Sequence, residues 1–210
     1  MKERAAPDTS RVFDSVKDKN EEILWIGKPN AFCFVFYGIP FLILGLTWGC
    51  IDVFILIQMM NSGEEMWGAG IPFIFLHAFP LWGSLLFMGW LWLAHGKTFY
   101  AYSNRRLLVR TGAIGVDYKT YDYDQLSNLE IRQGPIQKSF NVGTISFNTG
   151  QTDSKGRLLT SSFRAIPNSF EVFKMIKEVS MDVKTDEFYP NAKRPPKNEG
   201  YKTHYNPHEK

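Results

Sequence analysis

The residues of this sequence that could do chemistry lie inside two long apolar stretches. Asp52 is the one acidic side chain within the first stretch, and ionisable groups in such a setting are candidates for a functional role. His77, in the second stretch, can reach a similar depth and pair with it. Three interpretations stay open for Asp52 and His77: an interfacial structural pair, two side chains that face solvent, or proton or ion transfer.

A second set of candidates is basic and follows the second apolar stretch. Lys97, Arg105, Arg106 and Arg110 could contact lipid headgroups or a partner protein. Arg105 and Arg106 are adjacent, so on a strand they point to opposite faces and only one can face a given ligand. The competing interpretation places these two arginines in a turn and strand start beside the membrane.

The patterns typical of enzymes are not found. Residues 112–115 lack the Gly-Lys-Ser/Thr ending of a phosphate-binding loop, and residues 97–181 contain no histidine that could activate a serine. Cys33 and Cys50 are about five helical turns apart, too far for a disulfide or a shared metal. We therefore expect no enzymatic activity, no cofactor and no metal.

The two apolar stretches are long enough to cross a membrane. Residues 31–51 contain no Asp, Glu, Lys or Arg, the apolar character resumes from Val53 to Met60, and residues 68–94 carry no formal charge. The hydrocarbon core of a bilayer is spanned by about 20 helical residues. The sequence thus predicts a transmembrane hairpin at 31–96, with helices at about 31–58 and 69–95.

The flanking charges predict how this hairpin is oriented. The loop between the helices holds Glu64 and Glu65 and no basic residue, whereas lysines and arginines flank the outer ends. Basic flanks stay in the cytoplasm, so both termini are expected there. Trp67, Trp90 and Trp92 are expected at the membrane interfaces. The polar start of the chain has no signal peptide, so the first helix is the expected targeting signal.

Short alternating stretches after the hairpin predict an antiparallel sheet. The connections are too short for crossover helices, so neighbouring strands run antiparallel. Pro167 and a capping box from Asn168 to Glu171 predict a helix whose apolar face closes the sheet. The expected strands are Phe99–Ser103, Arg106–Thr111, Tyr118–Tyr123, Asn128–Arg132, Gly143–Asn148 and Leu158–Ile166.

The chain accordingly divides into five segments. Residues 97–181, the expected cytoplasmic domain, carry twelve basic and seven acidic side chains, and such an excess suits a position beside an anionic membrane face. The short pre-membrane segment either docks on this domain, which we favour, or lies at the interface. The segments are a polar N-terminal segment (1–20), the pre-membrane segment (21–30), the hairpin (31–96), the domain (97–181) and a Pro/Lys/Tyr-rich tail (182–210).

Four short motifs occur in order along the chain, and together they indicate a family. They are Glu21–Pro29, Tyr102–Leu107 with Gly112 after it, Phe140–Ile145, and Ile166–Asn168 at the start of the last helix. In this order the sequence resembles bacterial membrane proteins with a transmembrane hairpin and a pleckstrin-homology-like (PH-like) domain. The resemblance implies an α+β domain, with a partly open antiparallel barrel capped by a C-terminal helix, in the bacterial inner membrane.

The function expected from these features is a non-enzymatic, membrane-anchored adaptor. It would act as an accessory or assembly subunit of a larger membrane protein complex, with lipids and either that complex or a second copy as partners, and without nucleic acid. Gly38, Gly45 and Gly49 could let another helix approach closely. The alternatives are a module that senses anionic lipids and a component that transfers ions or protons through Asp52.

Overall fold

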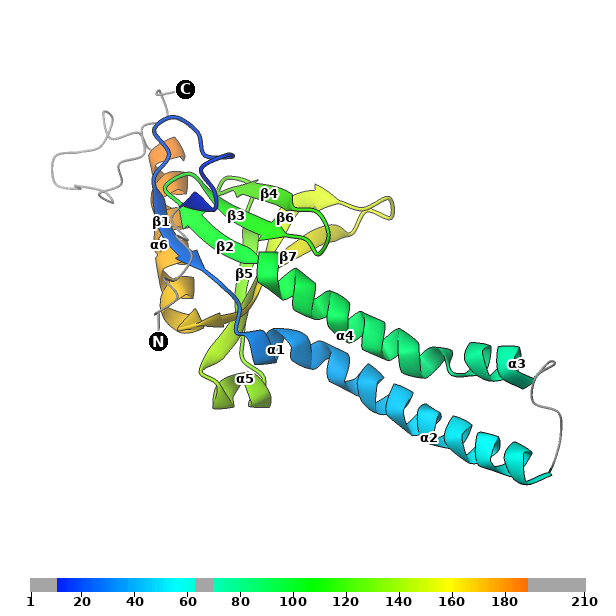
Figure 1. Cartoon of the computed structure of the whole chain (residues 1–210). Coiled ribbons are helices and arrows are strands. Elements are labelled where there is room, and N and C mark those ends of the chain that lie inside the picture. Colours follow the sequence, from blue (N-terminus) through cyan, green and yellow to red (C-terminus); the bar gives the residue numbers. More distant parts are fainter. Residues whose placement is uncertain (1–10, 63–69, 189–210) are drawn as a thin grey trace, which may run out of the picture.

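The computed structural model describes residues 11–62 and 70–188 of the chain. These residues form two antiparallel sheets, a helix packed against them, and a long helical hairpin that projects from one end (Figure 1). The expected α+β class with antiparallel sheets and a C-terminal helix is confirmed. The predictions for Glu64, Glu65, Trp67 and residues 189–210 lie outside the described residues.

The first sheet contains four strands, one from before the hairpin and three from after it. Its order is β1 (Ile23–Gly27), β2 (Phe99–Ser103), β3 (Arg106–Thr111) and β4 (Asp117–Asp122). β1 precedes the hairpin and β2 follows it, yet the two strands pair directly, with Gly27 opposite Tyr100. The prediction that the pre-membrane segment docks on the domain is confirmed.

The second sheet contains β5 (Ser127–Arg132), β6 (Val142–Thr152) and β7 (Leu158–Pro167). Its strands begin within a residue of the predicted positions, but β6 continues four residues past its predicted end at Asn148. The register shifts between Asn148 and Thr152, and Gly150 adopts a φ of +73° there. A glycine accommodates such a left-handed conformation without strain, so the strand continues through the irregularity.

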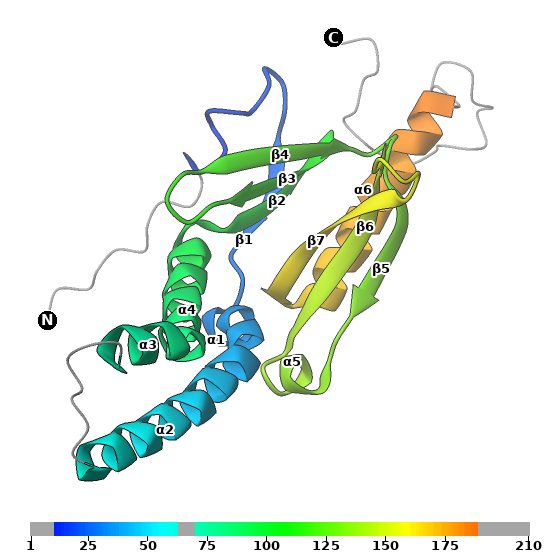
Figure 2. The same cartoon turned by 90° about the vertical axis from the view of Figure 1, so that its right-hand side faces the viewer.

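The two sheets and the last helix, α6 (Ser169–Phe188), share one hydrophobic core. Figure 2 shows the sheets side by side, with α6 against the second one. The apolar face predicted for this helix is buried at Val172 and Ile176. The core is mainly aromatic and aliphatic, and its largest fully buried members include Tyr123, Phe147, Phe163, Leu107, Ile145 and Ile166.

The helix α6 is longer than predicted. It continues to Phe188, whereas the tail was expected to begin at residue 182. Val183 is only 4 % exposed and Asp182 7 % exposed, and Lys184 donates a hydrogen bond to the Leu126 carbonyl. The helix therefore packs on the rest of the domain at least as far as Lys184, past the predicted boundary.

The first arm of the hairpin is a nearly continuous apolar helix. It consists of α1 (Ala31–Val35), a short 3-10 helix η2 (Phe36–Gly38) and α2 (Ile39–Ser62). The Asn30 side chain caps its start by accepting a hydrogen bond from Cys33 N. Pro40 has no N–H for the Phe36 carbonyl, so Ile39 N–H bonds to it instead. This substitution of partners explains the short 3-10 turn.

The second arm is broken, unlike the single helix predicted at 69–95. It consists of α3 (Gly70–His77) and α4 (Phe79–Lys97), separated at Ala78. Pro80 cannot donate to the carbonyl four residues earlier, which interrupts the helix. Among the described residues only Ala31–Ser62 is long and apolar enough to cross a membrane, with a mean hydropathy of 2.1. Of the two membrane-crossing helices predicted, one therefore has the length and hydropathy that a crossing requires.

The N-terminal segment contributes more to the fold than its polar composition suggests. Phe13 is 1 % exposed and packs on Phe99, Ala101 and Leu108, on the outer face of the first sheet. Tyr118 donates its phenolic O–H to the Val12 carbonyl over 3.1 Å. The described part of this segment therefore covers one face of the sheet.

Candidate functional site

The point where the hairpin enters the sheet domain is held by contacts from both arms. Asn30 N donates to the Ala165 carbonyl over 2.8 Å, and His95 Nε2 donates to the Pro29 carbonyl over 2.9 Å. Cys33 is buried with Val142 and Ala165. These bonds fix the base of the hairpin to β7 and to the chain just after β1.

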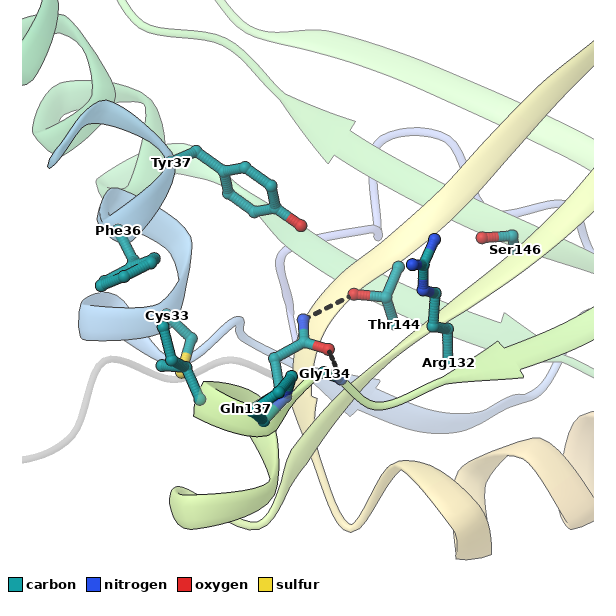
Figure 3. Close-up of a pocket in the computed structure, with 10 residues that line it drawn as sticks. Cys33, Phe36, Tyr37, Arg132, Gly134, Gln137, Thr144 and Ser146 are labelled. Carbon is teal, nitrogen blue, oxygen red and sulfur yellow. Dashed lines mark hydrogen bonds between the residues drawn. The ribbon is translucent and has the colours of Figure 1, made fainter. Parts of the chain in front are cut away.

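A cavity opens at this junction, between the first arm and the second sheet. It has a volume of about 540 Å³ and is shown in Figure 3. One wall comes from α1 and η2, and the other comes from β5, β6 and the short helix α5 (Pro135–Ser139). Its lining residues are Cys33, Phe36, Tyr37, Arg132, Gly134, Pro135, Ile136, Gln137, Thr144 and Ser146.

The polar groups of this junction cavity come from the sheet side. Gln137 Nε2 donates to Thr144 Oγ1 over 2.9 Å, and the Gln137 side-chain oxygen accepts from Gly134 N over 3.2 Å. Arg132 lies opposite Thr144 in the strand pair β5–β6. In Figure 3, the Tyr37 hydroxyl points from the helix side toward these groups.

A second cavity of about 440 Å³ lies on the other side of the hairpin base. It is bounded by α4, β3, β4 and β7, and its charged residues are Lys119, Arg164 and Asp117. Two cations and a carboxylate thus line this second cavity together, whereas the one charged residue that lines the junction cavity is Arg132.

The basic residues predicted as contacts do not gather into one site. Lys97 Nζ donates to the Ile114 carbonyl over 2.6 Å, in the loop between β3 and β4. Arg110 lies over the rings of Phe99 and Tyr118, at 5.5 and 5.8 Å from their centroids. Arg105 lies in the β2–β3 turn, at the end of β2 that points away from α4. This turn is therefore far from the hairpin base and not beside it.

Arg106 holds the N-terminal segment in place. Its guanidinium bonds to both oxygens of Glu21, over 3.1 and 2.8 Å, and reaches Asp18 over 3.0 Å. Burial by itself raises the pKa of Glu21, but hydrogen bonds from Arg106, the Asp18 N–H and Ser103 outweigh it and hold this pKa below its ordinary value. Arg106 thus has a structural partner within the chain.

The structure brings Asp52 and His77 together. Nδ1 of His77 lies 2.5 Å from one oxygen of Asp52, which is 5 % exposed. Trp48 Nε1 donates to the His77 carbonyl over 2.9 Å, and Trp82 Nε1 donates to the Phe75 carbonyl over 3.2 Å. The two indoles therefore satisfy carbonyls beside the break between α3 and α4, and Asp52 and His77 tie α2 to α3.

The predicted interface residues that the structure describes are Trp90 and Trp92. They are 52 % and 63 % exposed and lie in the last turns of α4 before the sheet domain. This placement agrees with a position near a membrane surface, where indole rings are favoured. Within the described ranges, no three His, Cys, Asp or Glu side chains gather closely enough to hold a metal ion.

Sequence reasoning missed the residues of the junction cavity. Tyr37 is hidden in an apolar run, and Arg132 matches no motif. Thr144 lies within the Phe140–Ile145 motif, but nothing in that motif singles out its side chain. The one weak signal for a binding site was the position of Arg132, which ends a strand two residues before Gly134 and Pro135. The cavity depends on contact between residues about one hundred positions apart, which no local pattern encodes.

Comparison with known proteins adds one finding. A family profile described as "Bacterial PH domain" matches residues 34–179, well over half of the chain. No curated protein matches, and no solved structure matches either. The matched range includes most of the hairpin, all six strands that follow it and more than half of α6.

Proposed function

The chain belongs to the bacterial PH domain family, and from this premise we propose that it is a non-enzymatic, membrane-anchored adaptor. In this proposal it acts as an accessory or assembly subunit of a larger membrane protein complex. The hairpin places the PH domain on the cytoplasmic face of the bacterial inner membrane, with both termini on that side.

The proposal requires that both arms of the hairpin cross the membrane. The first arm has the length and hydropathy to do so alone. In the second arm, we propose that α3 and α4 cross together, and Trp48 and Trp82 donate to the His77 and Phe75 carbonyls beside their break. A break is tolerated in a bilayer when the freed backbone groups are satisfied in this way.

The observation that carries the proposal is the insertion of the hairpin between two neighbouring strands. β1 and β2 pair directly across it, and the base is bonded to β7 through Asn30 and Ala165. A domain attached by one linker could reorient, whereas two connections and a packed base hold it in one pose. Such a fixed platform suits the positioning of partners better than reversible recruitment to a membrane.

The glycines that could receive another helix are already used inside the hairpin. A Cβ on Gly45 would overlap Ser84, one on Gly49 would meet Leu81 at 2.9 Å, and one on Gly38 would overlap Met88. We therefore expect the partner contact on the membrane side to use the exposed aromatic and aliphatic side chains of the hairpin, such as Phe41, Leu44 and Phe54. On the PH domain, the outward face of α6 offers Phe170 and Met181, 51 % and 45 % exposed.

The test is purification of the tagged protein from its native membranes in mild detergent, followed by mass spectrometry of what accompanies it. We expect stoichiometric recovery of one defined membrane complex. The double variant Phe170→Ser/Met181→Ser should reduce this recovery at least about fivefold, while Ile114→Ser, a 91 % exposed site on another loop, should not. A homogeneous protein without partners would refute the adaptor function.

Truncation variants in that experiment need the boundary that the structure gives. Removal of residues 189–210 tests the tail, whereas removal from residue 182 also deletes the buried Val183 and so damages the domain. Likewise, an isolated fragment 97–181 lacks β1 and the end of α6. Tests of the alternative function, sensing of anionic lipids, therefore use the full chain, whose association with anionic vesicles should weaken with salt.

A further inference from the structure

The junction cavity presents hydrogen-bond donors that have no partner among the described residues. This holds for the guanidinium of Arg132 and for the hydroxyls of Tyr37 and Ser146. Thr144 Oγ1 accepts hydrogen bonds from Gln137 Nε2 over 2.9 Å and from Ala165 N over 3.4 Å. Its own O–H is therefore left to donate. Figure 3 shows these side chains converging on one space from η2, β5 and β6.

The charge of the cavity favours an anion. None of its lining residues is acidic, and Arg132 supplies one permanent positive charge. Glu130, which lies opposite Ser146 in the strand pair β5–β6, accepts a hydrogen bond from Asn128 and does not line the cavity. A guanidinium binds phosphate through two parallel hydrogen bonds, which hydroxyl donors can supplement. Donor groups from three elements thus line the space that a phosphate group would enter.

The opposite wall of the cavity is apolar. Cys33, Phe36 and the ring of Tyr37 come from the first arm of the hairpin, while Pro135 and Ile136 come from α5. Phe32 and Phe140 stack beside it, with ring centroids 4.8 Å apart. A ligand with a phosphate at one end and hydrocarbon at the other matches both walls, and a volume of about 540 Å³ lies within the range of small-molecule sites.

We propose that the junction cavity binds the headgroup phosphate of an anionic glycerophospholipid, with an acyl chain lying along Phe36 and Tyr37. This inference rests on the proposed anchoring of the hairpin in the membrane, which places α1 at the level of the headgroups. The bound lipid would fill the space between the first arm of the hairpin and the second sheet. The site uses the inserted helix and the β5–β6 connection, not a cluster of basic loops.

The test is native mass spectrometry of the purified full chain titrated with phosphatidylglycerol. We expect one saturable lipid per chain, with weaker binding of phosphatidylcholine because its ammonium group lacks a carboxylate partner in the cavity. Arg132→Gln should weaken phosphatidylglycerol binding about tenfold, the value of one charge-assisted hydrogen bond. Tyr37→Phe and Ser146→Ala, which each remove only a hydroxyl, should weaken it by about two- to fivefold.

Lys138→Gln is the matched control, because Lys138 is exposed on α5 but does not line the cavity. If it weakens binding as much as Arg132→Gln, the attraction is a general charge effect and the proposal fails. Equal binding of glycerol 3-phosphate, which has no acyl chains, would instead identify a site for soluble anions and also overturn it. If Arg132→Gln, Tyr37→Phe and Ser146→Ala all bind phosphatidylglycerol as the wild type does, this cavity is not the lipid-binding site.

Thermal unfolding of each variant shows whether it is folded. If Arg132→Gln does not fold, Tyr37→Phe and Ser146→Ala, which each remove only a hydroxyl, still test the site. The result is independent of the adaptor function, because the titration uses purified protein without partners. If the wild-type protein binds no lipid but still recovers a membrane complex, this inference is refuted and the adaptor function is not. A saturable lipid on a protein that recovers no complex would refute the adaptor function alone.

Discussion

At the scale of single residues, the arginines and lysines of the PH domain differ in what they contact. Arg106 is paired with Glu21, Arg110 lies over two aromatic rings, and Lys97 bonds to loop carbonyls. Arg132, which no motif distinguishes, is the one whose guanidinium faces a cavity without a described partner. Proximity in sequence to the hairpin therefore did not identify the cation that faces the junction cavity.

Glu21 should make the stability of the protein depend on pH. Its pKa lies below the ordinary value of 4.5 in the folded protein, so its contribution is complete above that value and is lost as the pH falls through the lower, folded one. Glu21→Gln should remove about 1–3 kcal/mol at neutral pH and flatten the pH dependence. Thermal unfolding between pH 7 and pH 3 measures this effect.

The control for Glu21→Gln is Glu22→Gln, which changes an exposed neighbouring carboxylate. It should leave nearly unchanged both the midpoint temperature of unfolding at pH 7 and the decrease of this temperature as the pH falls. A Glu21→Gln protein that declines in acid as steeply as the wild type would show that other carboxylates cause the transition.

Asp52 and His77 should stabilise the hairpin as a pair. In a double-mutant cycle with Asp52→Asn and His77→Phe, we expect a coupling free energy of about 0.5–3 kcal/mol, measured by thermal unfolding in detergent. Thr47→Val serves as a control, because its hydroxyl bonds only within its own helix. Additive effects would argue against a structural pair and would favour the ion-transfer interpretation, which predicts instead that Asp52→Asn abolishes a flux.

At the scale of elements, the hairpin is held by close packing of α2 on α4. Gly45 and Gly49 are four residues apart on α2, and both face α4 closely enough that no Cβ fits without movement. Ser84, which lies against Gly45, is 6 % exposed and donates to the Leu81 carbonyl within its own helix. This contact uses the small-residue face that the sequence offered to an external helix.

Gly45→Ala should destabilise the hairpin by about 1–3 kcal/mol, because its Cβ would overlap Ser84 and the Pro80 carbonyl. Gly89→Ala is the matched control, since nothing lies within 4 Å of a Cβ there. It should be neutral or stabilising by up to about 1 kcal/mol, because alanine has a higher helix propensity than glycine. Equal destabilisation by both substitutions would contradict the packing of α2 on α4.

At the scale of the whole molecule, the hairpin and the PH domain form one unit. The first sheet cannot be completed without a strand from each side of the hairpin, and the N-terminal segment covers the outer face of that sheet. Folding of the domain and placement of the helices are therefore coupled. This coupling is what makes the domain a fixed platform in the proposed function.

The proposed two crossings can be measured by cysteine labelling. In a background with Cys33→Ala and Cys50→Ala, an impermeant maleimide should label Ser62→Cys, at the end of α2, in intact spheroplasts. Lys155→Cys, in the β6–β7 turn, should react only after lysis. Labelling of both positions from the same side would show that the first arm does not cross.

The sequence alone determined the features that depend on local pattern. Apolar length defined the first arm of the hairpin, alternation defined six strands to within a few residues, and Pro167 with Asn168 located the start of α6. These signals suffice because period, capping and hydropathy act between residues close in the chain. The order of short motifs also indicated a PH-like domain, which the match to the bacterial PH domain profile confirms.

Only the tertiary structure decided what residues distant in sequence do to one another. It showed that Pro80 breaks the second arm beside two indole donors, that Arg106 is paired with Glu21, and that α6 continues because Val183 finds a place in the core. It also formed the junction cavity from Tyr37, Arg132 and Thr144. Each of these outcomes depends on packing in three dimensions, where burial and unsatisfied hydrogen bonds determine the free energy and local sequence pattern does not.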